Sequence, residues 1–152
     1  MILDERTEFC DATALNTGGA GSYLLGDQID LTLARDIGLG EPVWFVVQCT
    51  TAFDSANDTA TAVFTLASDA SASIATNGSA TVHLVSPTIV IGAGAVAGSL
   101  LFAAPLPVEG NAYERYLGVL QTTAVQAFTA GAINAFLTHD IAKWKAYADA
   151  SN

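Results

Sequence analysis

Short segments in which apolar residues alternate with polar or small ones recur along the chain. The alternation is clearest at 62–66, AVFTL, and at 116–121, YLGVLQ, and it is typical of a strand that is buried on one face. Gly, Pro, Asn, Asp and Ser residues bound each segment, as they do at strand ends. The pattern predicts eight strands, at 29–34, 43–50, 61–68, 80–86, 88–91, 99–104, 116–123 and 132–138.

Eight short strands without a convincing central helix predict an all-β fold, a jelly roll or β-sandwich, because a sheet with one apolar face must bury that face against another layer. The length of 152 residues suits one domain with a single core. We expect an N-terminal arm and first turn region at 1–28, the sandwich at 29–139 and a C-terminal tail at 140–152.

The C-terminal tail has a helical pattern instead. Ile141, Trp144 and either Tyr147 or Ala148 recur at spacings of three and four residues behind Asp140, a candidate N-cap, which predicts a short amphipathic helix. A helix of about ten residues is marginal in water and must dock on something to persist. Two alternatives stay open: the tail docks on its own sandwich, or it reaches a neighbouring subunit, where Trp and Tyr are favoured anchors.

Composition adds an expectation about partners. Apolar residues make up 51% of the chain and charged residues only 13%, with a mean hydropathy of +0.42, so part of the surface is expected to meet protein. Fifteen acidic residues against five cations give a net charge of −10. A surface of that sign repels phosphate backbones, which argues against a nucleic-acid partner.

The two cysteines, Cys10 and Cys49, are expected to be separate reduced thiols, because two cysteines in a chain without a secretory leader more often stay unpaired. The opening MILDERTEF carries acids at positions 4, 5 and 8 and no apolar stretch, so it lacks the features of a signal peptide. Synthesis in a reducing cytoplasm is the expectation.

One segment imitates a nucleotide-binding motif. The predicted strand at 88–91 runs into 92–97, GAGAVA, which matches G-x-G-x-x-A. That motif works through a following helix whose N-terminus faces a pyrophosphate, but only six residues separate Gly98 from Pro105. A Gly/Ala-rich loop or hairpin turn is the preferred interpretation, and a nucleotide-binding enzyme is the weaker alternative.

Other chemistries have less support. The stretch 84–108 has no charged residue and is long enough to cross a bilayer, but Pro87 and three glycines interrupt it, so two strands joined by a loop are expected and no membrane span. His83 and His139 lie far apart in the sequence, and a histidine metal site needs a cluster. We therefore expect no catalytic residue, no metal and no cofactor.

Three short motifs carry a resemblance to a known family. The chain opens with MILD, the turn RDIGLGEP at 35–42 precedes the apolar run VWFVV at 43–47, and YERYL at 113–117 leads into a late strand. In these motifs the chain resembles the Bbp16-like capsid cement, or decoration, proteins of tailed bacteriophages. The resemblance implies a jelly roll and a virion structural protein, not an enzyme, that decorates the outer surface of an HK97-fold capsid, binds adjacent major capsid protein subunits and so gives capsid stabilisation.

The resemblance also implies partners and the surfaces that meet them. The chain is expected to form a homodimer or homotrimer, since a symmetric oligomer that grips several capsid subunits gains avidity. The charge-poor stretch 70–108 offers apolar surface, and both ends offer apolar side chains. The expected partner contacts are Ile2, Leu3, Phe9, Ile141, Trp144 and Tyr147. For the first three, packing on the chain's own sheet is the open alternative.

A second function fits the same fold. A virion-borne carbohydrate- or receptor-binding sandwich would expose Trp44, Trp144 or several tyrosines as a platform on which sugars stack. Trp44 lies within a predicted strand and is expected to be buried. This reading stays as the alternative to capsid cementing.

Overall fold

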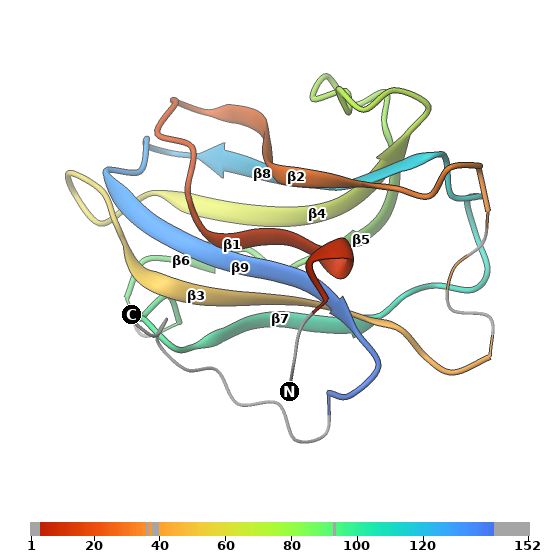
Figure 1. Ribbon diagram of the computed structural model, residues 1–152. Helices are drawn as coiled ribbons and strands as arrows, with labels where there is room; N and C mark the ends of the chain where they lie inside the picture. The colour runs from red at the N-terminus through yellow and green to blue at the C-terminus, as the bar shows by residue number, and fades with distance from the viewer. Residues whose placement is uncertain (1–3, 36, 38–39, 93, 142–152) are drawn as a thin grey trace.

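The computed structural model describes residues 4–141 except Asp36, Gly38, Leu39 and Ala93 (Figure 1). Within these residues the regular structure is almost entirely strand, preceded by one short 3-10 helix, η1 (Glu5–Thr7). The strands are β1 (Glu8–Ala14), β2 (Gly21–Asp30), β3 (Trp44–Asp54), β4 (Thr61–Asp69), β5 (Thr81–Val85), β6 (Ile89–Val90), β7 (Leu100–Pro105), β8 (Tyr116–Ala124) and β9 (Ala130–Thr138).

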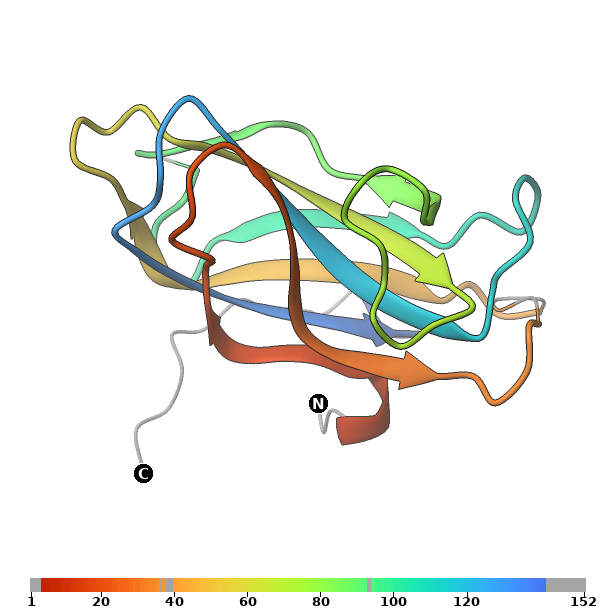
Figure 2. The same cartoon turned by 90° about the horizontal axis from the view of Figure 1, so that it is seen from above.

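The strands form two antiparallel sheets packed face to face (Figure 2). One sheet has the order β1-β9-β3-β7, and the other has the order β2-β8-β4-β5, with β6 also paired to β4. The pairs are nested along the chain: β1 lies with β9, β2 with β8, β3 with β7, and β4 with β5 and β6. This nesting is the rolled-up hairpin of a jelly roll. The predicted all-β jelly-roll sandwich is therefore confirmed.

Strand alternation decides which side chains fill the space between the sheets. Phe45 and Val47 of β3 lie opposite Leu137 and Ala135 of β9, and all four belong to the core. Phe9 of β1 joins them and meets Phe45 edge to face, with ring centroids 6.0 Å apart. Large apolar side chains from both ends of the chain thus meet in one core, whose burial is the main stabilising contribution.

The N-terminal part differs from the prediction. The strand expected at 29–34 is wrong beyond its first two residues, which end β2, and residues 31–34 belong to the connection to β3. Strands β1 and β2 occupy much of the region expected to be an arm, so the sandwich begins at Glu8. Pairing with β9 and β8 creates these two strands, which local alternation does not reveal. The other seven predicted strands coincide with β3 to β9.

The glycine-rich segment after β6 is a loop of turns. The hairpin alternative for it is wrong, because β6 and β7 belong to different sheets and the loop crosses from one to the other. The end of the loop is tied to β3: the Gly98 N–H donates to the Cys49 carbonyl at 2.8 Å, and the Cys49 N–H donates to the Ser99 carbonyl at 2.9 Å. Among the described residues, no helix is long and apolar enough to cross a membrane.

An inward-facing glutamine fixes the connection between β1 and β2. Gln121 of β8 is fully buried. Its Oε1 accepts the backbone N–H of Asn16 at 2.9 Å, and its Nε2 donates to the Asn16 carbonyl at 3.1 Å and to the Thr123 hydroxyl at 2.8 Å. Asn16 lies outside the strands. The Gln121 side chain therefore supplies the hydrogen-bond partners that a neighbouring strand would otherwise provide for the Asn16 backbone.

Replacing Gln121 by leucine removes these contacts at similar volume. We expect the free energy of unfolding to fall by about 2 kcal/mol, because the backbone groups of Asn16 lose their partners where water has little access. Urea unfolding followed by circular dichroism measures the change. The control is Thr122→Val at the exposed neighbouring position, expected to change stability by less than about 0.5 kcal/mol. Equal stability of Gln121→Leu and the unmodified protein would contradict the expectation.

Candidate functional site: two opposite edges of the sandwich

One edge of the sandwich carries exposed apolar side chains. It consists of β5 and β6 from one sheet and β7 from the other, and these strands lie at the opposite ends of the two strand orders from β2 and β1 (Figure 2). Val85, Val90, Val96 and Leu100 are 54%, 56%, 47% and 49% exposed. They stand on these strands or in the loop that joins β6 to β7. We call these four residues the apolar edge.

The apolar edge has no charge of its own. No Asp, Glu, Lys or Arg occurs from 70 to 108, the stretch that supplies it. Edge strands present unpaired backbone N–H and C=O groups, and proteins commonly protect them with charged side chains. Exposed apolar patches that lack such protection mark interaction surfaces. The part of the charge-poor stretch that runs from β5 to β7 thus lies along one edge of the fold.

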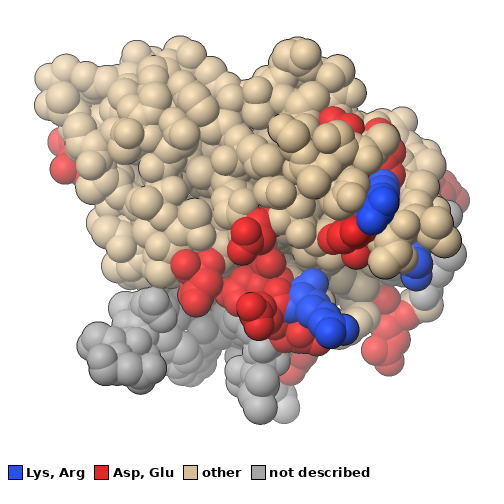
Figure 3. Space-filling view, turned by 45° about the horizontal axis from the view of Figure 1, so that its top comes forward, with Lys and Arg blue, Asp and Glu red and all other residues tan. Residues whose placement is uncertain are grey.

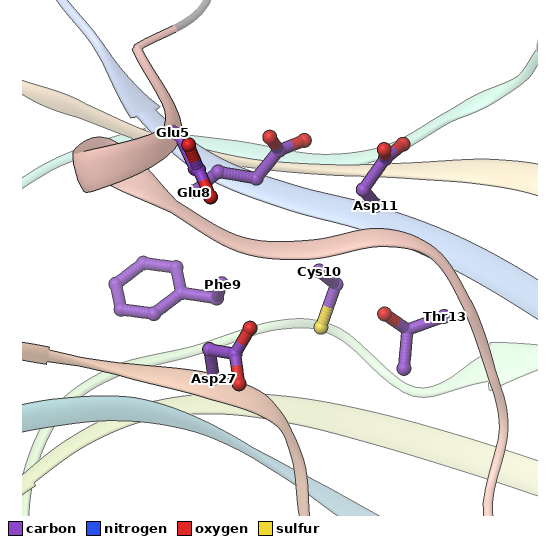
Figure 4. Close-up of a pocket in the computed structure, with 7 residues that line it drawn as sticks. All are labelled: Glu5, Glu8, Phe9, Cys10, Asp11, Thr13 and Asp27. Carbon is purple, nitrogen blue, oxygen red and sulfur yellow. The ribbon is translucent and has the colours of Figure 1, made fainter.

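The charged side chains gather elsewhere (Figure 3). Glu5, Glu8 and Asp27 line two neighbouring clefts of about 300 and 410 Å³ where η1 and β1 face β2. Figure 4 shows the first cleft: the Glu8 and Asp11 side chains point to one side of β1, while Cys10 points to the other side, toward β2. We call the acids that line these clefts, Glu5, Glu8, Asp11, Asp27 and Asp30, the acidic edge.

Burial in the first cleft favours the protonated form of the Cys10 thiol. Burial raises the pKa of Cys10 to about 12, with smaller contributions in the same direction from the carboxylates of Asp27 and Glu8, while a hydrogen bond with Thr13 acts against them. The thiolate is the nucleophilic form, so this cysteine stays protonated at neutral pH. Cys10 and Cys49 are both free and buried, which confirms the expected separate thiols. Within the described residues, no three His, Cys, Asp or Glu side chains are placed to hold a metal ion.

The motif at 113–117 anchors β8 to β2. The Arg115 guanidinium donates to both carboxylate oxygens of Asp30, at 2.9 and 2.8 Å, and it also lies 4.8 Å from the centroid of the Tyr116 ring. The hydrogen bond from Arg115 lowers the pKa of Asp30 to about 2, helped by the backbone N–H of Thr32. Because this pair is exposed to solvent, its contribution to stability is small. Its visible role is to set the register at the end of the two strands.

The same motif holds a histidine. The His83 ring stacks on the Tyr113 ring with centroids 3.9 Å apart, and its Nε2 lies 2.7 Å from the Ser68 hydroxyl. That hydroxyl also accepts the Glu114 backbone N–H at 3.0 Å. Ser68 is fully buried, and these contacts join β4, β5 and the segment that leads into β8. His139 is a separate, exposed residue whose Nδ1 lies 3.3 Å from the Pro42 carbonyl.

Stability is expected to depend on pH through His83. Burial lowers the pKa of His83 below its ordinary value of 6.5, although the Glu114 carboxylate acts in the opposite direction. The unfolded chain therefore binds the proton more readily, and the free energy of unfolding falls as the pH decreases from about 6.5 toward the folded-state pKa. Urea unfolding between pH 5 and 8 tests this. His83→Gln should flatten the dependence, and a slope unaffected by His83→Gln would refute this expectation.

The residues expected to contact partners have different environments in the structure. Phe9 is 2% exposed and lies in the core, where the alternative of packing on the chain's own sheet had placed it. Ile141 is half-buried at the end of the described chain. Ile2, Leu3, Trp144 and Tyr147, together with the predicted C-terminal helix, lie outside the described residues. Trp44, expected to be buried, is half-buried at the start of β3.

Comparison with known proteins supports a family assignment. The model of the Bbp16 family matches residues 9–137, which is the sandwich from the start of β1 almost to the end of β9. A search of curated proteins gave no match. Because the family match spans most of the chain and the complete set of paired strands, the chain belongs to the Bbp16 family, a family associated with bacteriophages.

Proposed function

We propose that this protein decorates the outer surface of a phage capsid, where it binds adjacent major capsid protein subunits and holds them together. The apolar edge is the observation that carries the proposal, and membership of a phage-associated family gives it context. An exposed, uncharged and apolar strip on an otherwise acidic molecule fits a protein surface better than a sugar or a phosphate. The role is binding, and no catalytic step is part of it.

In this proposal each edge binds a different partner. Two copies with a net charge of −10 each repel one another, but contact through the uncharged apolar edge keeps like charges apart. The apolar edge therefore joins copies into a homodimer or homotrimer. The acidic edge lies on the opposite side, where its negative charge attracts basic groups of the capsid subunits. Several modest contacts linked in one oligomer then act with the avidity of a single strong one.

Purified protein and expanded capsids of the same phage test the proposal. Analytical ultracentrifugation should give a dimer or trimer, and sedimentation with capsids should bring the protein down with the shells and raise their melting temperature. Binding to the capsid should weaken with added salt, because the acidic edge makes screened contacts. A protein that is monomeric at micromolar concentration and does not sediment with capsids would contradict the proposal.

The carbohydrate-binding alternative has its own outcome in this experiment. Trp44 is only half-buried, and among the described residues no row of fully exposed aromatic rings accompanies it on which sugars could stack. Glycan-array binding by a protein that ignores capsids would favour the receptor-binding reading, whereas capsid binding without glycan binding favours decoration.

A further inference from the structure

The loop between β8 and β9 presents a valine to solvent in an unfavourable backbone conformation. Val125 has φ +68°, in the left-handed region, where a β-branched residue is a rare outlier. The Gln126 N–H donates to the Ala124 carbonyl at 2.8 Å, so Val125 is the central residue of a γ-turn, and a positive φ marks the strained form of that turn. Val125 is 75% exposed, more than any other large hydrophobic residue that the structure describes.

Hydrogen bonds to the next residue hold this turn in place. The Gln126 Oε1 accepts from three donors in the connection between β3 and β4, at 3.2, 3.1 and 3.4 Å: the Asn57 backbone N–H and the hydroxyls of Thr59 and Ser55. Two residues further along, Phe128 is 1% exposed and belongs to the core. The loop is thus fastened directly after Val125, and the valine side chain is the part of it that extends into solvent.

The valine itself gives the folded protomer little in return for this strain. A glycine adopts a positive φ without a steric penalty, and asparagine tolerates it better than a β-branched residue does. Because Val125 keeps most of its area in water, it contributes little to the stability of the sandwich through burial. Strained residues that the surrounding structure holds in place cluster at sites where another molecule binds. The conformation of Val125 therefore indicates a role outside the protomer's own core.

The end of the sandwich around Val125 carries little charge. Figures 1 and 2 show its loop at the same end as the connections 15–20 and 55–60. Asp58 is the only charged residue in 15–20, 55–60 and 125–129. The loop joins β8 to β9, which are the neighbours of β2 and β1 in the two sheets. Val125 therefore lies on the side of the acidic edge and away from the apolar edge.

We propose that Val125 is an anchor by which each protomer docks on a major capsid protein subunit, where its side chain enters an apolar depression. This inference rests on the proposed function and names a contact residue for the capsid partner. An apolar side chain that is fully exposed in one protein and buried in the other contributes through the area removed from water. The acidic edge attracts the capsid over a distance, and Val125 makes the short-range contact.

The observations favour a capsid subunit over a second copy as the occupant. Copies joined through the apolar edge hold Val125 on the side away from their contact. Charge gives the same preference, because Asp58 beside the tip is exposed and the whole chain has a net charge of −10. A like-charged copy is repelled, whereas a surface with basic groups around the apolar depression is attracted.

Val125→Gly tests the proposal in the full-length chain, because it removes the side chain and the strain together. With expanded capsids of the same phage, the dissociation constant from co-sedimentation should rise about tenfold or more. The variant should unfold at the same or a higher urea concentration and form the same oligomer in sedimentation velocity. Val108→Gly is the matched control: Val108 is 57% exposed in the connection between β7 and β8, at the opposite end of the sandwich, and capsid binding should not change.

Photocrosslinking identifies the occupant. A diazirine amino acid placed at Val125 should, on irradiation of the decorated particle, join the protein to the major capsid protein. A crosslink to a second copy, or none to the capsid protein, would overturn the proposal. Capsid binding by Val125→Gly as tight as that of the unmodified protein, or an equal loss in Val108→Gly, would also overturn it and leave the proposed function standing. An unmodified protein that ignores capsids contradicts the proposed function itself, and this inference with it.

Discussion

Replacing Gly26 by alanine is expected to lower the free energy of unfolding by about 3 kcal/mol. Gly26 lies in β2 with φ +61°, in the left-handed region that costs an L-residue roughly 1 kcal/mol or more. A Cβ there would run into the Phe9 carbonyl oxygen and would lie 2.7 Å from the Cys10 sulfur. Relieving this clash means moving β1 away from β2, and overpacking of this kind costs a further 1–3 kcal/mol or so.

Equilibrium unfolding in urea, with the midpoint and slope both fitted, measures the loss. Gly78→Ala is the matched control. Gly78 also has a positive φ, +91°, but nothing lies within 4 Å of a Cβ at that position, so this variant reports backbone strain alone and should lose only about 1 kcal/mol. If Gly26→Ala costs no more than Gly78→Ala, the close approach of β1 and β2 contributes nothing to stability.

Gly26 also explains why the sequence did not reveal the first two strands. In GSYLLGDQID, a glycine and an aspartate follow a short apolar run, and locally they indicate a turn. The structure uses the glycine differently, because β1 passes so close that a side chain would not fit. The segment EFCDATA of β1 is too short and too poor in large apolar residues to show a clear alternation. Its partner strand, β9, lies more than a hundred residues away in the sequence. Local periodicity carries no information about such contacts.

The later strands could be predicted because each satisfies the strand pattern by itself. VWFVVQC and TAVFTLAS are rich in β-branched and aromatic residues and are bounded by turn residues, and they became β3 and β4. The local sequence favours such strands, and pairing with neighbouring strands then stabilises them. The tail after Ile141 follows a helical pattern in the sequence, and that prediction concerns residues that the structure does not describe.

The two edges also differ in how far the sequence predicts them. The apolar edge was foreseeable in outline, since an uncharged stretch from 70 to 108 must place its apolar residues somewhere and cannot hide all of them in one small core. The acidic edge could not be predicted from the sequence. Its carboxylates come from η1, β1 and β2. They become neighbours only because β1 and β2, the end strands of the two sheets, lie on the same side of the sandwich. A cluster of residues that only the strand topology brings together cannot be predicted before the fold is known.

Replacing Val90 by glutamate is expected to weaken self-association by about 30-fold or more. Val90 is 56% exposed on β6, so the folded protomer tolerates a charge there. In an oligomer joined through the apolar edge, each copy would bury an unpaired carboxylate and add a like charge opposite its partner. Penalties of about 2 kcal/mol or more are typical for such a buried charge, and each 1.4 kcal/mol or so is a tenfold loss in affinity.

Sedimentation velocity over a dilution series measures the dissociation constant, and capsid binding should fall in parallel because avidity requires the oligomer. Leu33→Glu introduces the same charge at another exposed apolar residue, 67% exposed in the connection between β2 and β3, and should leave the oligomer intact. Unfolding in urea must show that both variants are as stable as the unmodified protein. If both variants dissociate equally, net charge alone controls assembly; if neither does, the copies meet through another surface. Only selective dissociation of Val90→Glu identifies the apolar edge as the contact, because the two variants carry identical charge and differ only in where it stands.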